Sequence, residues 1–258
     1  AIAALNDIFV DHRFGSAGAK VVIEDFLDGQ EFSLMSFVNG TEFWPMPISQ
    51  DHKRAYDDDK GPNTGGMGAY SPVPQIGDDV VQQAIETIVK PTVEAMVAEG
   101  TPFTGILYAG LIATQDGPKV IEFNARFGDP ETEVVLPKLT SDLGAGITAI
   151  LNGETPEFTW DEDNATLGVV LASDGYPGEI VKGAHIPQIA TDAGSHVYYA
   201  GVARGDDGLV ANSGRVLLVE ASAPDLAAAQ RKVYGILDAV NTEGMFYRHD
   251  IGAKALKA

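Results

Sequence analysis

The stretch from residue 105 to residue 131 constrains the fold more than any other part of the sequence. It contains two apolar runs, residues 106–114 and 120–123, and the segment between them includes Asp116 and Gly117. An Asp-Gly pair between apolar runs is a strong signal for a β-hairpin. We therefore predict two paired antiparallel strands at this place.

Polar side chains end the second strand of this hairpin. Glu122 and Asn124 are two residues apart, so on a strand they point to the same face. A carboxylate beside an amide carbonyl suits Mg²⁺, which binds one or two protein oxygens and completes its shell with phosphates and water. Arg126, Asp129 and Glu131 follow directly. Such a group of charges is suited to holding anions around a cation.

An isolated Glu-x-Asn pattern favours a plainer interpretation, an amphipathic hairpin whose polar end is solvated. The string Asn-x-Arg-Phe-Gly-Asp-Pro-Glu that begins at Asn124, however, has no evident packing role after an apolar strand. That string is what favours a metal and anion site.

Composition narrows the classes of partner. The 258 residues carry a formal net charge of −20, so the protein should repel nucleic-acid backbones and anionic membranes. The absence of cysteine excludes disulfides, thiolate catalysis and cysteine-based zinc sites. No apolar run approaches ~18 residues, and the first residues lack a signal-peptide pattern. We predict no nucleic-acid or membrane partner and a cytoplasmic location.

A long segment with little periodicity, residues 50–72, interrupts the patterned chain. Long irregular loops inside compact domains are usually functional or disordered. Its basic residues Lys53 and Arg54 are suited to phosphate charge, although an ion pair with residues 57–59 is an alternative. Three glycines within residues 65–68 allow backbone N–H groups to approach an anion. Such a cluster alone favours a flexible turn.

Hydrophobic patterning predicts the other elements. We expect strands at residues 21–24, 32–38 and 41–48, with Asn39-Gly40 as the turn between the last two. We expect a helix at residues 78–99, capped by Asp78 or Asp79 and kinked at Pro91, and a second helix at residues 132–151. After a lapse at residues 152–164, a small α+β module follows, with strands at 166–172, 196–201 and 215–220 and a helix at 224–240.

Histidine offers little to a metal site. No predicted helix contains a histidine, so none shares a helix face with a second His, Asp or Glu at the i, i+4 spacing. His52 lies in the irregular segment and is the one histidine that we consider near a substrate.

Two long strings indicate a family. IEFNARFGDPE at residues 121–131 and QDHKRAYDDDKGPNTGGMGAYSP at residues 50–72 closely resemble the glycinamide ribonucleotide synthetases, or phosphoribosylamine–glycine ligases, of the ATP-grasp superfamily. Both strings are nearly free of gaps. The resemblance extends from VVIEDFLDG at residues 21–29 to GRVL at residues 214–217, and so covers nearly the whole chain.

The resemblance implies an architecture. It predicts an α+β fold in which residues 1–158 form the second half of an ATP-grasp domain, an antiparallel sheet with helices. Residues 159–258 would form a small α+β carboxy-terminal domain that covers the nucleotide cleft. In this family the glycine-rich loop over the ATP phosphates lies in an earlier half, so we expect this chain to be the carboxy-terminal part of a longer enzyme and catalytically incomplete alone.

The resemblance also implies a reaction. The carboxylate of glycine would attack the γ-phosphoryl group of ATP, and the amine of 5-phosphoribosylamine would then attack the glycyl phosphate. Glycinamide ribonucleotide, ADP and phosphate would leave, with Mg²⁺ or Mn²⁺ as the metal, in purine biosynthesis. Glycine and 5-phosphoribosylamine are thus the expected small-molecule substrates.

Individual residues take roles from the same resemblance. Backbone groups in the segment Glu24, Asp25, Phe26 and Leu27 would pair with adenine, and Glu31 would reach the ribose. Glu122 and Asn124 would hold the metal. Arg126 would stabilise the transferring phosphoryl group, and Asp129 and Glu131 would orient this turn or the glycine ammonium group. The residues expected to bind the substrates are Asp51, Lys53, Arg54, Asn63, Thr64, Gly65, Gly66, Met67 and Gly68.

Two other functions stay open from the sequence. One is an ATP-grasp ligase or carboxylase for another acid or amine, which the loop at residues 50–72 argues against. The other is a non-catalytic nucleotide-binding or assembly module, against which the joint presence of Glu122, Asn124 and Arg126 counts.

Overall fold

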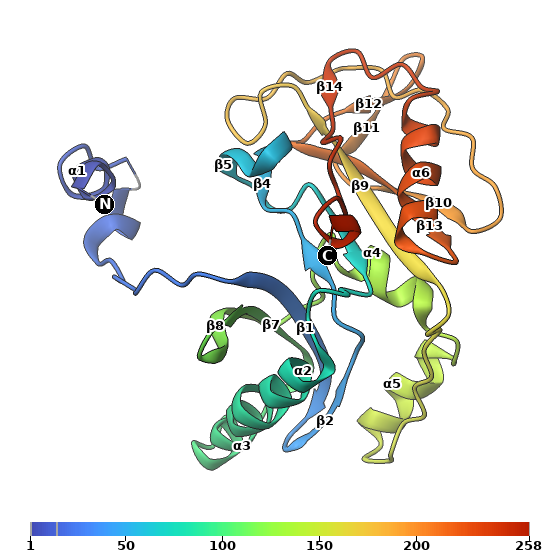
Figure 1. The fold of residues 1–258 in the computed structure, drawn as a ribbon. Helices are drawn as coiled ribbons and strands as arrows, with labels where there is room; N and C mark the ends of the chain where they lie inside the picture. The colour runs from blue at the N-terminus through green and yellow to red at the C-terminus, as the bar shows by residue number, and fades with distance from the viewer. Residues whose placement is uncertain (1, 14, 258) are drawn as a thin grey trace.

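The computed structural model of the protein describes residues 2–13 and 15–257. Helices and antiparallel sheets mix along these residues, which confirms the predicted α+β class. Two sheets dominate, one of four strands and one of six. Figure 1 shows them in separate parts of the molecule, with helices α2 and α3 beside the first sheet and helix α6 against the second.

The first sheet has the strand order β2-β1-β7-β8 and contains both predicted hairpins. Its strands are β1 Gln30–Asn39, β2 Glu42–Pro45, β7 Thr104–Thr114 and β8 Gly117–Asn124. β1 turns into β2 at Gly40, whose φ of 63° is a conformation that glycine adopts readily. Thr114 pairs with Gly117, so the second hairpin has a two-residue loop that ends one residue before this glycine.

The second sheet has the order β10-β13-β9-β6-β3, and β14 also pairs with β9. Its strands are β3 Gln50–Asp51, β6 Gly68–Ser71, β9 Ala165–Ser173, β10 Ser195–Tyr199, β13 Arg215–Ala223 and β14 Met245–Phe246. Two short strands from the irregular segment therefore continue the sheet of the carboxy-terminal part. The division of the chain at residues 158 and 159 stays a prediction, and this sheet crosses it.

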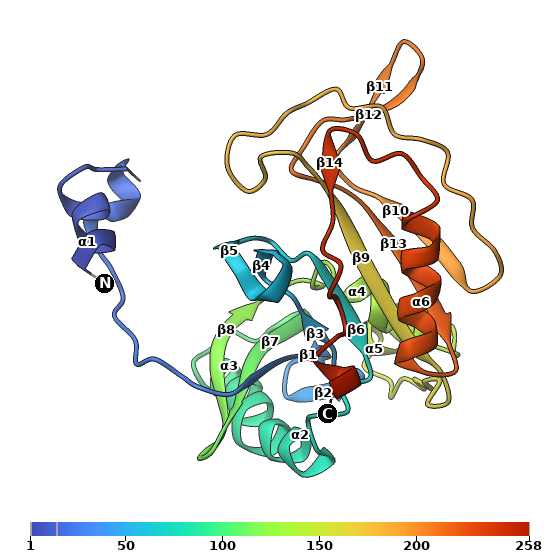
Figure 2. The same ribbon diagram turned by 45° about the horizontal axis from the view of Figure 1, so that its top comes forward.

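The irregular segment is more regular than its pattern predicts. Between β3 and β6 it forms a small hairpin of β4 Arg54–Tyr56 and β5 Lys60–Asn63, joined by the 3-10 turn η2 Asp57–Asp59. A second two-stranded hairpin, β11 Val202–Gly205 with β12 Gly208–Ala211, lies near the far end of the six-stranded sheet in Figure 2. The last element is the 3-10 helix η5 Ala255–Lys257.

The first long helix agrees with its prediction, including the disturbance at proline. It consists of α2 Asp78–Ala84, a π-helical turn η3 Ile85–Val89 and α3 Lys90–Ala98. Pro91 has no N–H to donate to the carbonyl four residues earlier, and its ring crowds that carbonyl, so the preceding turn widens. Ala84, Val89 and Val93 bury its apolar face in the larger core.

The prediction of one helix at residues 132–151 was wrong. The structure has a single turn α4 Thr132–Val135, the 3-10 turn η4 Leu136–Lys138 and a separate helix α5 Leu143–Leu151. Pro137 disfavours continuation of the helix from α4, and the Asp142 side chain caps the new helix by accepting from the Ala145 N–H at 2.9 Å. A four-residue helix also has too small a dipole to help hold a phosphate beside Glu131.

The predicted strand at residues 21–24 was also wrong, because residues 20–28 form neither helix nor strand. Both neighbours of β1 in its sheet are other strands, so this run has no partner, and Val22 and Ile23 are more than 80% exposed. In Figures 1 and 2 the segment runs as an extended connection from α1 (Ile2–Phe9) and η1 (Gly15–Ala19) to β1. Helix α1 stands apart from both sheets.

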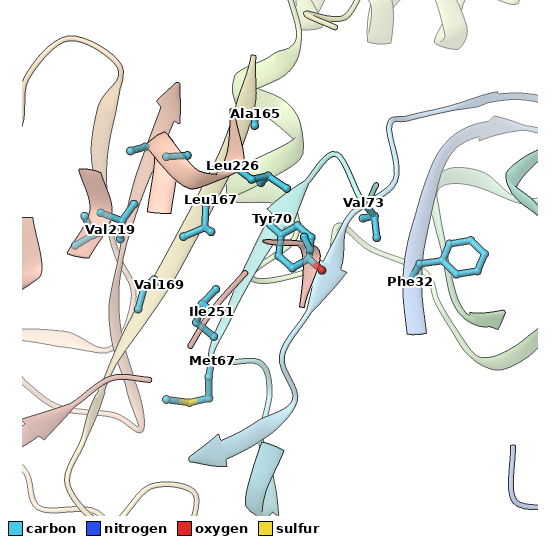
Figure 3. Packing of buried hydrophobic residues seen from close by; sticks show 14 of the residues in the cluster. Phe32, Met67, Tyr70, Val73, Ala165, Leu167, Val169, Val219, Leu226 and Ile251 are labelled. Carbon is cyan, nitrogen blue, oxygen red and sulfur yellow. The ribbon is translucent and has the colours of Figure 1, made fainter. Parts of the chain in front are cut away.

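Two hydrophobic cores hold the molecule together. Figure 3 shows the larger one, where Tyr70 of β6, Leu167 of β9 and Ile251 lie in the same cluster. Helix α6, Leu226–Leu237, covers this sheet and is capped by Asp225, close to the helix predicted at residues 224–240. No helix among the described residues has the length and apolar character needed to cross a membrane.

Candidate active site

A polar cavity of about 260 Å³ lies where β8, the turn after it and the irregular segment meet. It brings together residues that are up to 80 positions apart in the chain. Predicted site residues make up most of its wall: Asp51, Lys53, Asn63, Thr64, Gly65, Glu122, Asn124, Arg126, Asp129 and Glu131.

Strand β8 places Glu122 and Asn124 on this cavity, as strand alternation predicts. Glu122 pairs with Gly110 but Val120 pairs with Leu111, so Ile121 is an extra residue in a β-bulge. The bulge lies directly before the polar pair and turns Val120 and Ile121 together toward a second cavity. The Glu122 side chain is 49% exposed, and its Oε1 lies 4.0 Å from the Lys53 Nζ.

Asp51 and Lys53 form a hydrogen-bonded pair in the cavity wall. The Lys53 Nζ donates to the Asp51 Oδ2 at 3.2 Å, while the Asp51 Oδ1 is buried without a hydrogen-bond partner. Burial and the nearby Glu131 raise the pKa of Asp51 to about 8, against the lowering effect of Lys53. Burial alone would lower the pKa of Lys53, but Asp51 and Glu131 outweigh it and raise that pKa. Lys53 therefore stays a cation at the mouth of this cavity.

Glu131 is buried in the cavity wall, with 3% of its surface exposed. Its Oε1 accepts from the Tyr108 hydroxyl at 2.7 Å and from the Ser33 hydroxyl at 3.0 Å. Burial, and next the Glu131 charge, raise the pKa of Tyr108 well above its ordinary value. Tyr108 therefore stays protonated and holds Glu131 against β1 and β7.

Arg126 and Asp129 lie in the turn after β8 and face the same cavity. The Arg126 Nη1 donates to the Phe127 carbonyl at 2.8 Å, which directs the exposed guanidinium along the turn. The Asp129 Oδ1 accepts from the Arg215 Nη1 at 2.8 Å, a contact across 86 residues. The turn is thus fixed by a residue from the carboxy-terminal part of the chain.

A second cavity of about 330 Å³ gathers the residues predicted to bind the nucleotide. Glu24, Asp25, Phe26, Leu27 and Glu31 all line it. Its other wall is apolar and comes from three side chains of β7 and β8: Ile112, Val120 and Ile121. Glu31 and Ile121 also line a small space shared with Lys53 and Glu122, so the second cavity adjoins the first.

Four predicted substrate-binding residues do not line the polar cavity. Met67 has no exposed surface and packs in the larger core, and Gly68 begins β6. Gly66 has a φ of +114°, and a Cβ there would lie 2.6 Å from the Asp51 Oδ1. Glycine at this position therefore allows the loop to pass close to Asp51. The Arg54 Nη1 donates to the Gly61 carbonyl at 2.8 Å, inside its own hairpin.

The expectation that this glycine cluster offers N–H groups to an anion stays a prediction, and in this structure three N–H groups of the segment have partners within the protein. The Gly65 N–H donates to the Tyr176 hydroxyl, the Gly66 N–H to the Thr64 hydroxyl and the Met67 N–H to the His52 carbonyl. All three donors are satisfied within the protein. Asn63, Thr64 and Gly65 of this segment line the polar cavity.

Comparison with known proteins identifies the family. The family described as "Phosphoribosylglycinamide synthetase, ATP-grasp (A) domain" matches residues 1–132, and "Phosphoribosylglycinamide synthetase, C domain" matches residues 166–254. The chain belongs to the phosphoribosylglycinamide synthetase family.

Individual relatives agree with this family. Phosphoribosylamine–glycine ligases from Streptococcus pyogenes serotype M6 and Lactococcus lactis subsp. lactis are 54% and 55% identical over 100% and 98% of the chain. The chain spans 61% and 60% of the lengths of these curated relatives. A crystal structure of phosphoribosylamine–glycine ligase from Thermotoga maritima matches with a TM-score of 0.79 and 37% identity, over 88% of this chain and 57% of that one.

The synthetase family shares its fold with a wider group. The biotin carboxylase domain of 2-oxoglutarate carboxylase from Hydrogenobacter thermophilus matches with a TM-score of 0.70. The match covers 95% of this chain and 53% of that chain, at 11% identity. That likeness concerns the fold alone.

Sequence reasoning missed several residues of the synthetase cavity. Tyr108 and Gly128 line it, and Ser33, Tyr176 and Arg215 hold its lining residues in place. Tyr108 pairs with Asn124 across β7 and β8, so a correct strand register was the signal that would have placed it. Tyr176 and Arg215 contact the irregular segment across more than 100 residues, and no pattern in the neighbouring sequence indicates these contacts.

His52 is buried, with 2% of its surface exposed, and neither ring nitrogen has a hydrogen-bond partner. It lines a neighbouring charged cavity rather than the polar one. Burial, then the charges of Arg248 and Lys254, lower the pKa of His52 from 6.5 to about 4. The unfolded chain therefore binds a proton between those values and the folded chain does not.

We expect this difference to make the protein less stable as the pH falls from 6.5 to 4. The His52 contribution should reach roughly 3 kcal/mol, from 1.36 kcal/mol per unit of pKa shift. Between pH 6.5 and pH 4, the free energy of unfolding should fall by roughly 3 kcal/mol less in a His52→Phe variant than in the wild-type protein. Urea denaturation at several pH values measures both falls. Parallel curves for the two proteins would show that His52 is protonated when folded.

Proposed function

We propose that this chain carries the metal and acceptor part of an ATP-dependent ligase that joins glycine to 5-phosphoribosylamine. One observation supports this most strongly: Glu122, Asn124 and Arg126 share a polar cavity with Lys53 and Asn63. That cavity adjoins a second one with an apolar wall. A ligase of this type needs both, one for the reacting groups and one for the nucleotide base.

ATP would enter with its adenine in the second cavity. Ile112, Val120 and Ile121 offer flat apolar contact to a purine ring, and the extended segment at residues 24–27 has backbone groups suited to its edges. Glu31 lies between the two cavities, where the ribose hydroxyls would follow the base. The phosphates would then extend toward Glu122.

The donor set near the phosphates fits a divalent metal. Glu122 and Asn124 would hold Mg²⁺ or Mn²⁺ through a carboxylate and an amide oxygen. The described residues contain no group of three or more His, Asp or Glu side chains arranged for a metal, which agrees with an ion that relies on phosphates and water. When bound, such an ion supplies charge neutralisation for phosphoryl transfer.

Chemistry then follows in two steps. The carboxylate of glycine attacks the γ-phosphorus of ATP, the bond to the bridging oxygen breaks, and glycyl phosphate and ADP form. The amine of 5-phosphoribosylamine attacks the acyl carbon, loses a proton and displaces phosphate, which gives glycinamide ribonucleotide. Arg126 and Lys53 are the cations placed to stabilise the transferring phosphoryl group.

The remaining residues would bind and orient. Asn63, Thr64 and Gly65 would contact the second substrate at the cavity wall. Glu131 is held by Tyr108 and Ser33, so we assign it to orienting the turn after β8. Asp129 is half exposed and would meet the glycine ammonium group or hold the turn through Arg215.

We also propose a division into an ATP-grasp portion, residues 1–158, and a small carboxy-terminal domain, residues 159–258. The two family matches, at residues 1–132 and 166–254, support a boundary in this region. We place the reaction in the cytoplasm, where ATP is available.

Product analysis by mass spectrometry tests this function. The natural full-length protein is incubated with MgATP, glycine and 5-phosphoribosylamine, and each substrate is omitted in turn. Glycinamide ribonucleotide that requires all three substrates is the expected result. ADP release without this amide would indicate another acceptor, and no nucleotide turnover would favour a non-catalytic binding module.

Replacing Arg126 with lysine tests its role in the transfer step. We expect kcat to fall about 100-fold, because a planar fork of donors is replaced by a point charge at the transferring group. The KM for ATP should change little. The exposed Arg231 on α6, changed to lysine, is the matched control, and an Arg126→Lys rate within twofold of wild type would show that the guanidinium only shapes its turn.

A further inference from the structure

Both backbone groups of Gly65 are bound by side chains from the carboxy-terminal part of the chain. The Gly65 N–H donates to the Tyr176 hydroxyl at 2.9 Å, and the Gly65 carbonyl accepts from the Arg215 Nη1 at 3.0 Å. These contacts span 111 and 150 residues of sequence. Gly65 lines the polar cavity directly after Asn63 and Thr64, so the contacts fix the wall of the proposed acceptor site.

Arg215 also binds a second segment of the cavity wall, the turn after β8, with the same nitrogen. Its Nη1 also donates to the Asp129 carbonyl at 2.8 Å and to the Asp129 Oδ1 at 2.8 Å. One nitrogen with two hydrogens thus serves three acceptors on two separate segments, and at least one hydrogen is shared. The Arg215 side chain is 22% exposed, so its position is set by packing as well as by these bonds.

Close packing leaves little freedom to either member of the pair. A Cβ at Gly65 would lie 3.2 Å from the Arg215 guanidinium carbon, and a Cβ at Gly214 would lie 2.2 Å from the Tyr176 ring. The loop therefore lies against the guanidinium, and the tyrosine ring lies over the residue that precedes Arg215. Arg215 is the first residue of β13, at an irregularity in its pairing with β9.

We propose that Tyr176 and Arg215 are positioning residues that clamp the loop at Gly65 to the turn at Asp129, and so set the shape of the site for the phosphorylated amine. This role rests on the proposed function for its substrate. The two clamping residues lie in the part that matches the C domain, and the clamped residues lie in the part that matches the A domain. The acceptor site is therefore complete only when the carboxy-terminal part is docked.

Kinetics of variants in the natural full-length protein test the clamp. We expect Arg215→Met to raise the KM for 5-phosphoribosylamine about tenfold or more and to leave the KM for ATP within about twofold. Arg215→Lys should restore little, because the lysine ammonium group ends one bond short of the Nη1 nitrogen that contacts both segments. Tyr176→Phe removes one hydrogen bond and should raise the same KM about threefold to tenfold. The matched controls are Arg204→Met and Tyr199→Phe, both at exposed positions.

Hydrogen exchange supplies a readout that does not depend on the substrate. The peptide that contains Gly65 should exchange faster in both Tyr176→Phe and Arg215→Met, while peptides from α6 stay protected. Equal rises in the KM values for ATP, glycine and 5-phosphoribosylamine would overturn the positioning role and indicate a general loosening of the fold. Unchanged kinetics would overturn it as well, whatever the exchange shows. If the wild-type protein makes no glycinamide ribonucleotide, the proposed function fails. Exchange at Gly65 that is the same in both variants as in wild type would then overturn the clamp as well.

Discussion

Glu122→Ala should lower the rate of glycinamide ribonucleotide formation by about a thousandfold, equivalent to about 4 kcal/mol of lost transition-state stabilisation. The change removes the carboxylate of the proposed Glu122 and Asn124 metal pair, and one amide oxygen is a poor site for a divalent ion. Stability should change little, because the Glu122 side chain is 49% exposed and its nearest cation is 4.0 Å away.

Three measurements on the full-length protein check this prediction. They are product formation over a titration with Mg²⁺, the same titration with Mn²⁺, and thermal unfolding without nucleotide. Glu94→Ala on α3 is the matched control, since Glu94 is exposed and lies outside both cavities. A Glu122→Ala enzyme with wild-type turnover at low Mg²⁺ would remove β8 from the proposed metal site.

Arg248→Met should destabilise the fold by about 2–3 kcal/mol, because it removes charged hydrogen bonds from a buried guanidinium whose partner carboxylates are partly exposed. Arg248 is 1% exposed, and its Nε and Nη2 donate to the two carboxylate oxygens of Asp250, each at 2.8 Å. Its Nη2 lies 3.1 Å from the Asp59 Oδ1, and its Nη1 donates to the Arg54 carbonyl. Loss of the guanidinium leaves two carboxylates close together without their shared cation.

The pKa of Asp250 reports on the same cluster. Burial alone would raise this pKa, but the hydrogen bonds from Arg248 lower it to about 2. Denaturation by urea at pH 7 measures the loss in Arg248→Met, and Arg231→Met on the exposed face of α6 is the control. A loss below about 1 kcal/mol would mean that the cluster behaves like a surface ion pair.

Local sequence signals predicted the parts of the site that depend on neighbouring residues. Asn39-Gly40 and Asp116-Gly117 indicated the two hairpins of the first sheet, because few residues adopt the backbone conformations of such turns. Alternation along β8 placed Glu122 and Asn124 on one face, and both line the polar cavity. The family resemblance pointed to the segment at residues 24–31, which lines the second cavity.

Patterns of this kind failed where an element depends on a distant partner. The apolar run at residues 21–24 resembles a strand, yet it pairs with no strand of the structure. Gly68 begins a strand that pairs with β9, about 100 residues later, and Met67 directly before it packs in the larger core. The Gly65 N–H donates to the Tyr176 hydroxyl, a contact across 111 residues that the local sequence does not encode.

The sequence by itself thus determined the chemistry available to this protein: the oxygen pair on one strand, the cations of the loop and the turns that carry them. Only the tertiary structure decided which of these groups meet. Tyr108 reaches Glu131, Arg215 reaches Gly65 and Asp129, and Arg248 reaches Asp59, across separations that no local pattern spans. The physical reason is that turn conformation and strand alternation are set within a few residues, whereas sheet register and the docking of two sheets are set by the packing of the whole chain.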